Sequence, residues 1–156
     1  MSEIPGQSDP LDHEIIAEIY CHIVFWTRDF APTLTRETLA AAAETMDQAM
    51  FTVDGEALVV GGAENHLHVL ARLSPSRSLQ ETLGALRRYS EARIAGVCGI
   101  PDFSWSHSEL AVTISPEDLD RARRFVQDQQ SYHDLVPFEA ELRDLFDEHG
   151  FDYDGK

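Results

Sequence analysis

One stretch of eight residues, "HLHVLARL" (66–73), constrains the fold of this chain more than any other. In a β-strand, successive side chains point to opposite faces of the sheet. One face of this stretch then carries only apolar side chains: Leu67, Val69, Ala71 and Leu73. The other face carries His66, His68, Leu70 and Arg72. The pattern predicts a strand with one side in the core and the other side available for chemistry.

Three other segments also have the composition of strands. They are rich in β-branched, aromatic or small apolar residues, and they read "IYCHIVFWT" (19–27), "ALVVGG" (57–62) and "FSWSHSELAVTIS" (103–115). The turn "AEN" separates the second of them from residues 66–73, which predicts a hairpin.

Helices are expected between these strands. Thr35 is suited to cap a first helix, "RETLAAAAETMDQAMF". Ser78 and Glu81 form a capping box, which predicts a second helix that ends at about Ile94.

Two C-terminal helices complete the pattern. One begins near Pro116 and includes "RARRFVQDQQ" (121–130), where Phe125 and Gln129 would share one helix face. The other runs from about Pro137 to His149. The element order predicts an α+β, ferredoxin-like βαββαβ fold, with helices on one face of an antiparallel sheet plus C-terminal helices.

The length and composition indicate one domain. We expect a flexible lead-in over residues 1–18 and a single domain over residues 19–156. No apolar run approaches the roughly 18 residues that a membrane span needs. The acidic N-terminus does not resemble a signal peptide, and Cys21 and Cys98 form no metal-binding or disulfide pattern. We therefore expect a cytoplasmic protein without a membrane partner.

The charge is unevenly distributed. The formal net charge is −16, which argues against unselective binding of nucleic acid. Residues 66–100 nevertheless carry a net charge of +3, from two glutamates and the five arginines Arg72, Arg77, Arg87, Arg88 and Arg93. These arginines are candidates for contact with a DNA backbone, and the alternative is a solvated helix face paired with acidic residues.

His66 and His68 would lie about 7 Å apart on one strand face, so both imidazoles can converge on one ion. A third ligand with an oxygen atom would favour Mg²⁺ or Mn²⁺. The alternative is a polar strand face with two solvated imidazoles.

Three segments resemble the single-tyrosine HUH transposases of the insertion-sequence 200/605 type, which include the REP-associated tyrosine transposases. The segments are "YCHIVFWT", "ENHLHVLARL" and "RRFVQDQQSYHDLVPFEAELRDLFDEHGFDYD", in this order. The most specific parts are the His-hydrophobic-His triplet and the pattern formed by Gln129, His133, Phe138, Glu141 and Leu142.

The resemblance implies a site and a reaction. His66 and His68 would bind a divalent ion, Mg²⁺ or Mn²⁺, which polarises a scissile phosphate in single-stranded DNA, and Gln129 would complete the metal site. A tyrosine four residues before this glutamine would attack phosphorus, form a 5′-phosphotyrosine and release a 3′-hydroxyl. The resemblance also implies binding of DNA hairpins and a homodimer in which the tyrosine helix reaches the partner's histidines.

The nucleophile's position is occupied by Phe125. A phenyl ring has no oxygen that could bond to phosphorus, so cleavage by the family's route should fail. Tyr132 would lie about 10 Å further along the helix axis, while Tyr20 and Tyr89 belong to other elements.

Three functional hypotheses follow. The first is a transposase-like protein that binds single-stranded hairpin DNA and a metal ion but is defective in strand cleavage. The second is a domesticated interaction protein that has lost DNA binding. The third is an active transposase or nuclease with another nucleophile. A metal-bound water could serve, with His107 or His133 as general base, and the alternative for both histidines is a surface position.

Overall fold

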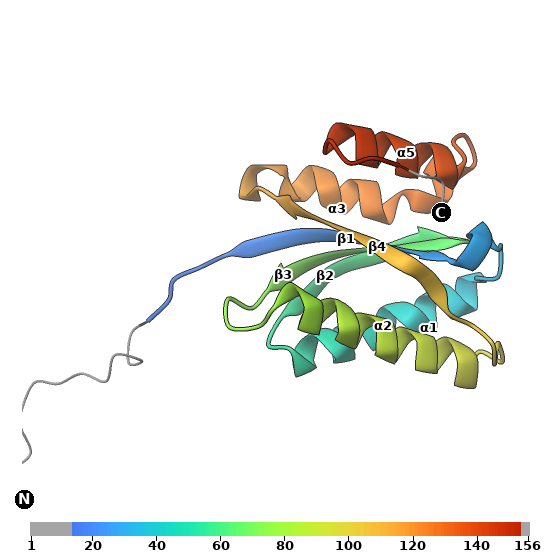
Figure 1. Cartoon of the computed structure of the whole chain (residues 1–156), viewed down its shortest axis with the longest axis horizontal. Coiled ribbons are helices and arrows are strands. Elements are labelled where there is room, and N and C mark those ends of the chain that lie inside the picture. Colours follow the sequence, from blue (N-terminus) through green and yellow to red (C-terminus); the bar gives the residue numbers. More distant parts are fainter. Residues whose placement is uncertain (1–13, 154–156) are drawn as a thin grey trace, which may run out of the picture.

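The structure is a computed structural model that describes residues 14–153 (Figure 1). Its strands are β1 (Ile19–Thr27), β2 (Glu56–Ala63), β3 (His66–Leu73) and β4 (Trp105–Ile114). Its helices are α1 (Arg36–Thr52), α2 (Leu79–Gly96), α3 (Leu119–Gln127), α4 (Gln129–His133) and α5 (Phe138–Glu148), with short 3₁₀ turns η1 (Arg28–Phe30) and η2 (Pro116–Asp118). The first thirteen residues of the expected lead-in lie outside the described residues, and residues 14–18 form no helix or strand.

The four strands form one antiparallel sheet in the order β2-β3-β1-β4. This arrangement confirms the predicted α+β class with a βαββαβ core. The predicted caps are also present: the Thr35 hydroxyl accepts a hydrogen bond from the Thr38 N–H, and the Ser78 hydroxyl accepts one from the Glu81 N–H. Gly150, with φ of 72°, follows the end of α5 as expected.

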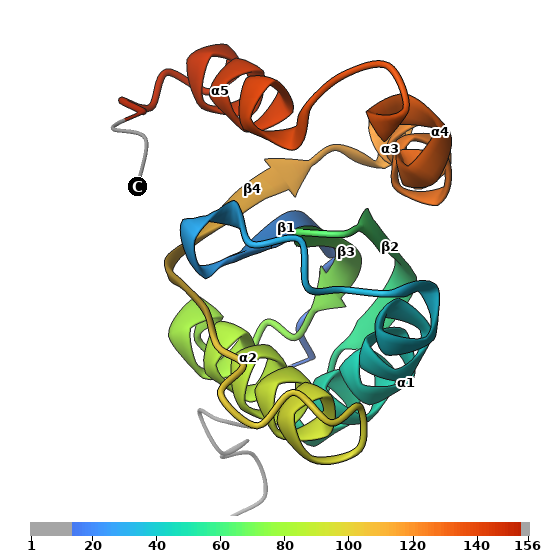
Figure 2. The same ribbon diagram turned by 90° about the vertical axis from the view of Figure 1, so that its right-hand side faces the viewer.

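Helices cover both faces of the sheet: the two helices of the βαββαβ core share one face, as expected, and the C-terminal helices, for which no face was predicted, cover the other. Helices α1 and α2 lie on one side, and the C-terminal helices α3, α4 and α5 lie on the other (Figures 1 and 2). The reason is visible in β1 and β3, where Val24 and Leu70 are fully buried on the face opposite the main core. Apolar residues on both faces of a sheet need cover on both sides.

The alternation predicted for residues 66–73 is confirmed on its apolar side. Leu67, Val69 and Ala71 are fully buried in the core between the sheet and helices α1 and α2, with Leu73 packed at its edge. The opposite face of the sheet holds a smaller apolar cluster under α5, composed of Val24, Trp26, Leu110, Val112, Phe138 and Leu142. The strand face of His66 and His68, which was expected to be available for chemistry, is therefore covered by helices.

The expected continuous helix over residues 121–130 is interrupted at Asp128, between α3 and α4. The Gln129 side-chain Nε2 donates to the Phe125 carbonyl at 3.2 Å. In a continuous helix that carbonyl would accept from the Gln129 backbone N–H. Phe125 and Gln129 therefore belong to different helices, and the Gln129 side chain turns inward, where it is 1% exposed.

Candidate metal centre

His66 and His68 lie on β3 and face the C-terminal helices. Both are completely buried, and their ring centroids are 5.1 Å apart. Burial lowers the pKa of His66 to about 2 and that of His68 to about 3. Both imidazoles are therefore neutral at neutral pH, which is the form that can bind a metal ion.

Glu141 on α5 is a third candidate ligand. Its Oε1 lies 3.1 Å from His68 Nε2, and its Oε2 lies 3.8 Å from His66 Nε2. One ligand atom from each of the three residues lies within 4.8 Å of the others. Burial raises the pKa of Glu141 to about 7. This carboxyl is therefore partly protonated at neutral pH, and a nearby positive charge would favour its carboxylate form.

Gln129 and His133 complete the group. Gln129 Oε1 lies 2.8 Å from His66 Nε2 and 2.9 Å from His133 Nε2. The amide Nε2 of Gln129 donates to Phe125 and, at 3.4 Å, to Glu141 Oε1. His133 Nε2 also lies 2.6 Å from Glu141 Oε2. The structure thus brings together His66, His68 and Gln129, the three ligands named from the sequence.

Two candidate ligand atoms of this group lack a hydrogen-bond partner among the described residues. His68 Nε2 and Glu141 Oε2 make no hydrogen bond within the described part of the chain, despite their close neighbours. His66 Nδ1 lies 3.0 Å from Asn65 Oδ1. A neutral imidazole carries one proton, so if Nδ1–H donates to Asn65, the Nε2 that faces the Gln129 oxygen is an acceptor. Two acceptors then point at each other, and a cation between them would satisfy both.

His22 on β1 supports His68 from behind. Its Nε2 lies 2.7 Å from His68 Nδ1, and the two rings stack with centroids 4.9 Å apart. Burial lowers the pKa of His22 to about 3. Because His68 Nδ1 is engaged with His22, its Nε2 is directed towards Glu141. His22 is therefore placed to fix the orientation and tautomer of a metal-binding imidazole.

Sequence reasoning missed the positions of three of these residues. The expectation of a surface position for His133 is wrong, because its side chain is only 10% exposed and contacts Glu141. A signal for Glu141 was present: it falls on the same helical stripe as Phe138 and Leu142, so an acidic residue was due to be buried. Likewise, His22 alternates with Val24 and Trp26 on one face of β1.

Phe125 lies beside the histidines, on the side of α3 that faces the sheet. Its ring centroid is 5.5 Å from that of His68 and 6.1 Å from that of His22, both edge-on. Tyr132 packs on Phe125, with ring centroids 5.5 Å apart. Tyr89 is on α2, on the opposite face of the sheet, and Tyr20 donates to Glu18.

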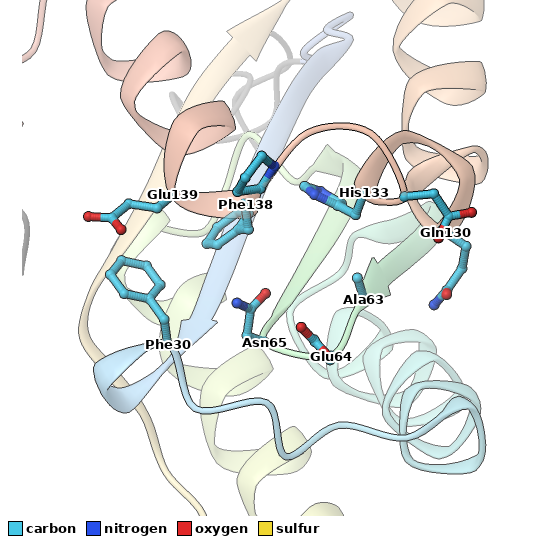
Figure 3. A pocket seen from close by; sticks show the side chains of 10 residues that line it. Phe30, Ala63, Glu64, Asn65, Gln130, His133, Phe138 and Glu139 are labelled. Atoms are coloured by element: carbon cyan, nitrogen blue, oxygen red, sulfur yellow. The ribbon is translucent and has the colours of Figure 1, made fainter.

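A cavity of about 500 Å³ adjoins the centre (Figure 3). His133 and Phe138 form part of its wall, and both also contact His66, with ring centroids at 4.4 Å and 3.8 Å. Glu64, Asp134 and Glu139 give the cavity an acidic lining.

The family model described as "Transposase IS200 like" matches residues 15–129, well over half of the chain. The chain belongs to the IS200-like transposase family. Among curated proteins, none is significantly similar to it.

Two solved structures share the fold of this IS200-like chain. A proposed transposase from Deinococcus radiodurans R1 is 14% identical, with a TM-score of 0.61 over 75% of this chain and 95% of that one. A REP-associated tyrosine transposase bound to a REP hairpin is 13% identical, with a TM-score of 0.55 over 83% of this chain and 76% of that one.

The arginines named from the sequence do not gather at the centre of this IS200-like protein. Arg87, Arg88 and Arg93 belong to α2, on the far face of the sheet, and Arg77 precedes that helix. Four of the five are in ion pairs: Arg72 with Glu56, Arg77 with Asp54 and Glu81, Arg87 with Glu91 and Glu109, and Arg93 with Glu44. Arg88 is exposed and has no ion pair among the described residues.

The remaining candidate base, His107, is exposed on β4. Of the described helices, none is long and apolar enough to cross a membrane.

Proposed function

We propose that this IS200-like protein binds a divalent metal ion and single-stranded hairpin DNA in the cytoplasm, but does not cleave DNA through a tyrosine. The observation that carries the proposal is Phe125. Its ring lies edge-on to His68, at the place where the family resemblance puts the nucleophile. Nucleophilic attack on phosphorus needs an oxygen, and this ring supplies none.

The proposed metal ligands are His66, His68, Gln129 and Glu141. The neutral imidazoles, the amide oxygen and the buried carboxylate form a mixed nitrogen and oxygen donor set that suits Mn²⁺ or Mg²⁺. Where phosphate can reach it, a divalent ion would supply Lewis-acid stabilisation of negative charge on phosphate oxygens. Phe138, stacked on His66, and His22, stacked on His68, hold the two imidazoles in place.

Binding of hairpin DNA is proposed from family membership, and a structural neighbour is described as bound to a REP hairpin. The arginines proposed for backbone contact remain Arg72, Arg77, Arg87, Arg88 and Arg93, of which Arg88 is free of ion pairs among the described residues. The net charge of −16 should make binding weak and strongly dependent on salt.

The absence of cleavage is tested with a pool of single-stranded hairpin oligonucleotides with randomised flanks. Those that bind are incubated with the protein and Mn²⁺, and covalent protein–DNA adducts are sought on denaturing gels. The wild-type protein should form none, and an adduct would contradict the proposal. Loss of such an adduct in Tyr132→Phe would identify Tyr132 as a substitute nucleophile.

The matched variant Phe125→Tyr adds one hydroxyl oxygen at the same position. An adduct formed by this variant and not by the wild type would show that this oxygen is the only missing element and that DNA phosphates reach the centre.

An interaction protein without DNA binding is the second candidate, favoured by one observation. Acidic neighbours already neutralise four of the five arginines. The absence of any salt-sensitive binding to the hairpin pool, measured by fluorescence anisotropy, would support this function.

We also propose that the protein is a homodimer, as the family resemblance implies. The measurement is light scattering coupled to size-exclusion chromatography, with and without Mn²⁺. Twice the mass of one chain is expected, and the mass of a single chain would contradict it.

A further inference from the structure

The four proposed ligands of the candidate centre are almost completely buried. His66 and His68 are 0% exposed, and the side chain of Glu141 is 3% exposed. The ring of Phe138 stacks on His66 with an interplanar angle of 8°, and the ring of Phe125 covers an edge of His68. A scissile phosphate would need an open path to this position, whereas the proposed ligands are buried.

The protein also supplies four ligand residues for an ion, with up to five donor atoms if both Glu141 oxygens bind. Two imidazole nitrogens, the Gln129 amide oxygen and the Glu141 carboxylate converge from different elements. Catalytic metal sites keep a position for water or substrate, whereas structural sites are filled by protein ligands. Five donor atoms would leave at most one position on a six-coordinate Mn²⁺ or Mg²⁺, and the burial of these residues closes the approach of a phosphate to that position.

The ligands join segments that are otherwise weakly connected. His66 and His68 belong to the central sheet, whereas Gln129 begins the five-residue helix α4 and Glu141 lies in the eleven-residue helix α5. Helices this short are marginal on their own and depend on tertiary contacts. An ion held by all four residues would fasten α4 and α5 to β3, so its binding energy would become folding energy of the C-terminal segment.

We propose that the metal ion of this chain is enclosed and structural: it ties the C-terminal helices to the sheet and is not accessible to the phosphates of DNA. The inference rests on the metal binding proposed above. Its consequence is that metal binding and DNA binding are independent of each other in this protein.

The wall between the centre and the adjoining cavity is thin. His133 and Phe138 contact His66 on one side and line the 500 Å³ cavity on the other (Figure 3). Removal of the His133 side chain should therefore let water from the cavity reach the ion.

The test uses the full chain with Mn²⁺ as the probe. Calorimetry first establishes binding, and water-proton relaxation then measures how much water exchanges on the bound ion. We expect low relaxation enhancement in the wild type, unchanged by inorganic phosphate or by the hairpin pool. We expect a higher enhancement in His133→Ala. A large wild-type enhancement that phosphate or DNA reduces would overturn the inference while metal binding stands. The absence of any Mn²⁺ binding would overturn both.

The structural role has its own readout in thermal unfolding. Mn²⁺ at about 100 times its dissociation constant should raise the wild-type Tm by about 5–10 °C. It should also slow hydrogen exchange in α4 and α5. Glu141→Gln should lose the response, whereas Glu148→Gln, on an exposed position of the same helix, should keep it. If Glu141→Gln does not fold, the wild-type exchange data decide: bound Mn²⁺ that leaves α4 and α5 unprotected contradicts the proposal.

Discussion

His22 would act on the proposed metal centre without touching the ion. It contacts the proposed ligand His68 through its Nε2 at 2.7 Å and holds the opposite nitrogen of that ring towards Glu141. Partners of this kind typically contribute a factor of about 10–100 in metal affinity.

His22→Ala should therefore weaken Mn²⁺ binding by about 10–100-fold, measured by calorimetry. His22→Gln should recover part of the loss, because its amide can still hydrogen-bond to His68 Nδ1. If Gln and Ala weaken binding equally, His22 only fills space. Unchanged affinity in both variants would remove His22 from the site.

The buried titratable groups also make the stability of the metal-free protein dependent on pH. His22, His66 and His68 have lowered pKa values in the folded chain, so below pH 6.5 the unfolded state binds more protons and stability falls. Glu141 has a raised pKa and acts in the opposite direction between pH 7 and pH 4.5. Because the three histidines together bind more protons on unfolding than Glu141 releases, the net effect is a loss of stability as the pH falls.

Urea unfolding in the presence of a chelator should show a loss of about 2 kcal/mol between pH 7.5 and pH 5.5. A stability that is constant or rises over this range would mean that the imidazoles are not buried in the neutral form.

Among the secondary-structure elements, α3 is positioned by its direct contact with a strand backbone. At Gly61 on β2, an added Cβ would lie 2.2 Å from the Val126 carbonyl oxygen of α3. Only a glycine allows this approach. The contact sets the distance of Phe125 from the sheet, since Phe125 precedes Val126.

Gly61→Ala should push α3 away from the sheet and destabilise the protein by about 1–3 kcal/mol. Gly96→Ala is the matched control, because an added Cβ there meets nothing within 4 Å. It should be neutral or slightly stabilising. Urea unfolding measures both variants, and equal effects would show that the approach of α3 is not limiting.

The elements that sequence reasoning predicted well are those determined locally. The Thr35 and Ser78 caps and the alternation of residues 66–73 need no distant partner, and the βαββαβ order follows from them. The interruption at Asp128 was missed because it depends on where the Gln129 side chain finds its partners, His66 and His133, in the folded chain.

The distinction between local and distant contacts also explains which residues of the candidate site could be predicted. His66 and His68 are brought together by strand periodicity alone, so the sequence is sufficient to pair them. Glu141 comes from α5, beyond the region matched by the family model, and its approach depends on the packing of Phe138 and Leu142. His22 is next to His68 only because β1 pairs with β3.

At the scale of the whole molecule, the candidate metal centre and most of the arginines proposed for DNA contact lie on opposite faces of the sheet. The candidate centre lies under the C-terminal helices, whereas α2 and its arginines lie on the other side (Figure 1). Arg88 on α2 and Arg124 on α3 are both exposed and lack ion pairs among the described residues, so they form a matched pair.

Arg88→Ala should lower affinity for the hairpin pool several-fold and reduce its salt dependence, whereas Arg124→Ala should have a smaller effect. Fluorescence anisotropy over a series of salt concentrations measures both. The reverse order would place DNA against α3.

The enclosed centre has a consequence for the history of the chain. If the wall formed by His133 and Phe138 excludes DNA, two independent features prevent strand cleavage: this wall and the missing hydroxyl at Phe125. Phe125→Tyr alone should then stay inactive, and only its combination with His133→Ala could form the covalent adduct. No single substitution would revert such a protein to a mobile-element enzyme, so a host could retain the gene at little risk to its genome.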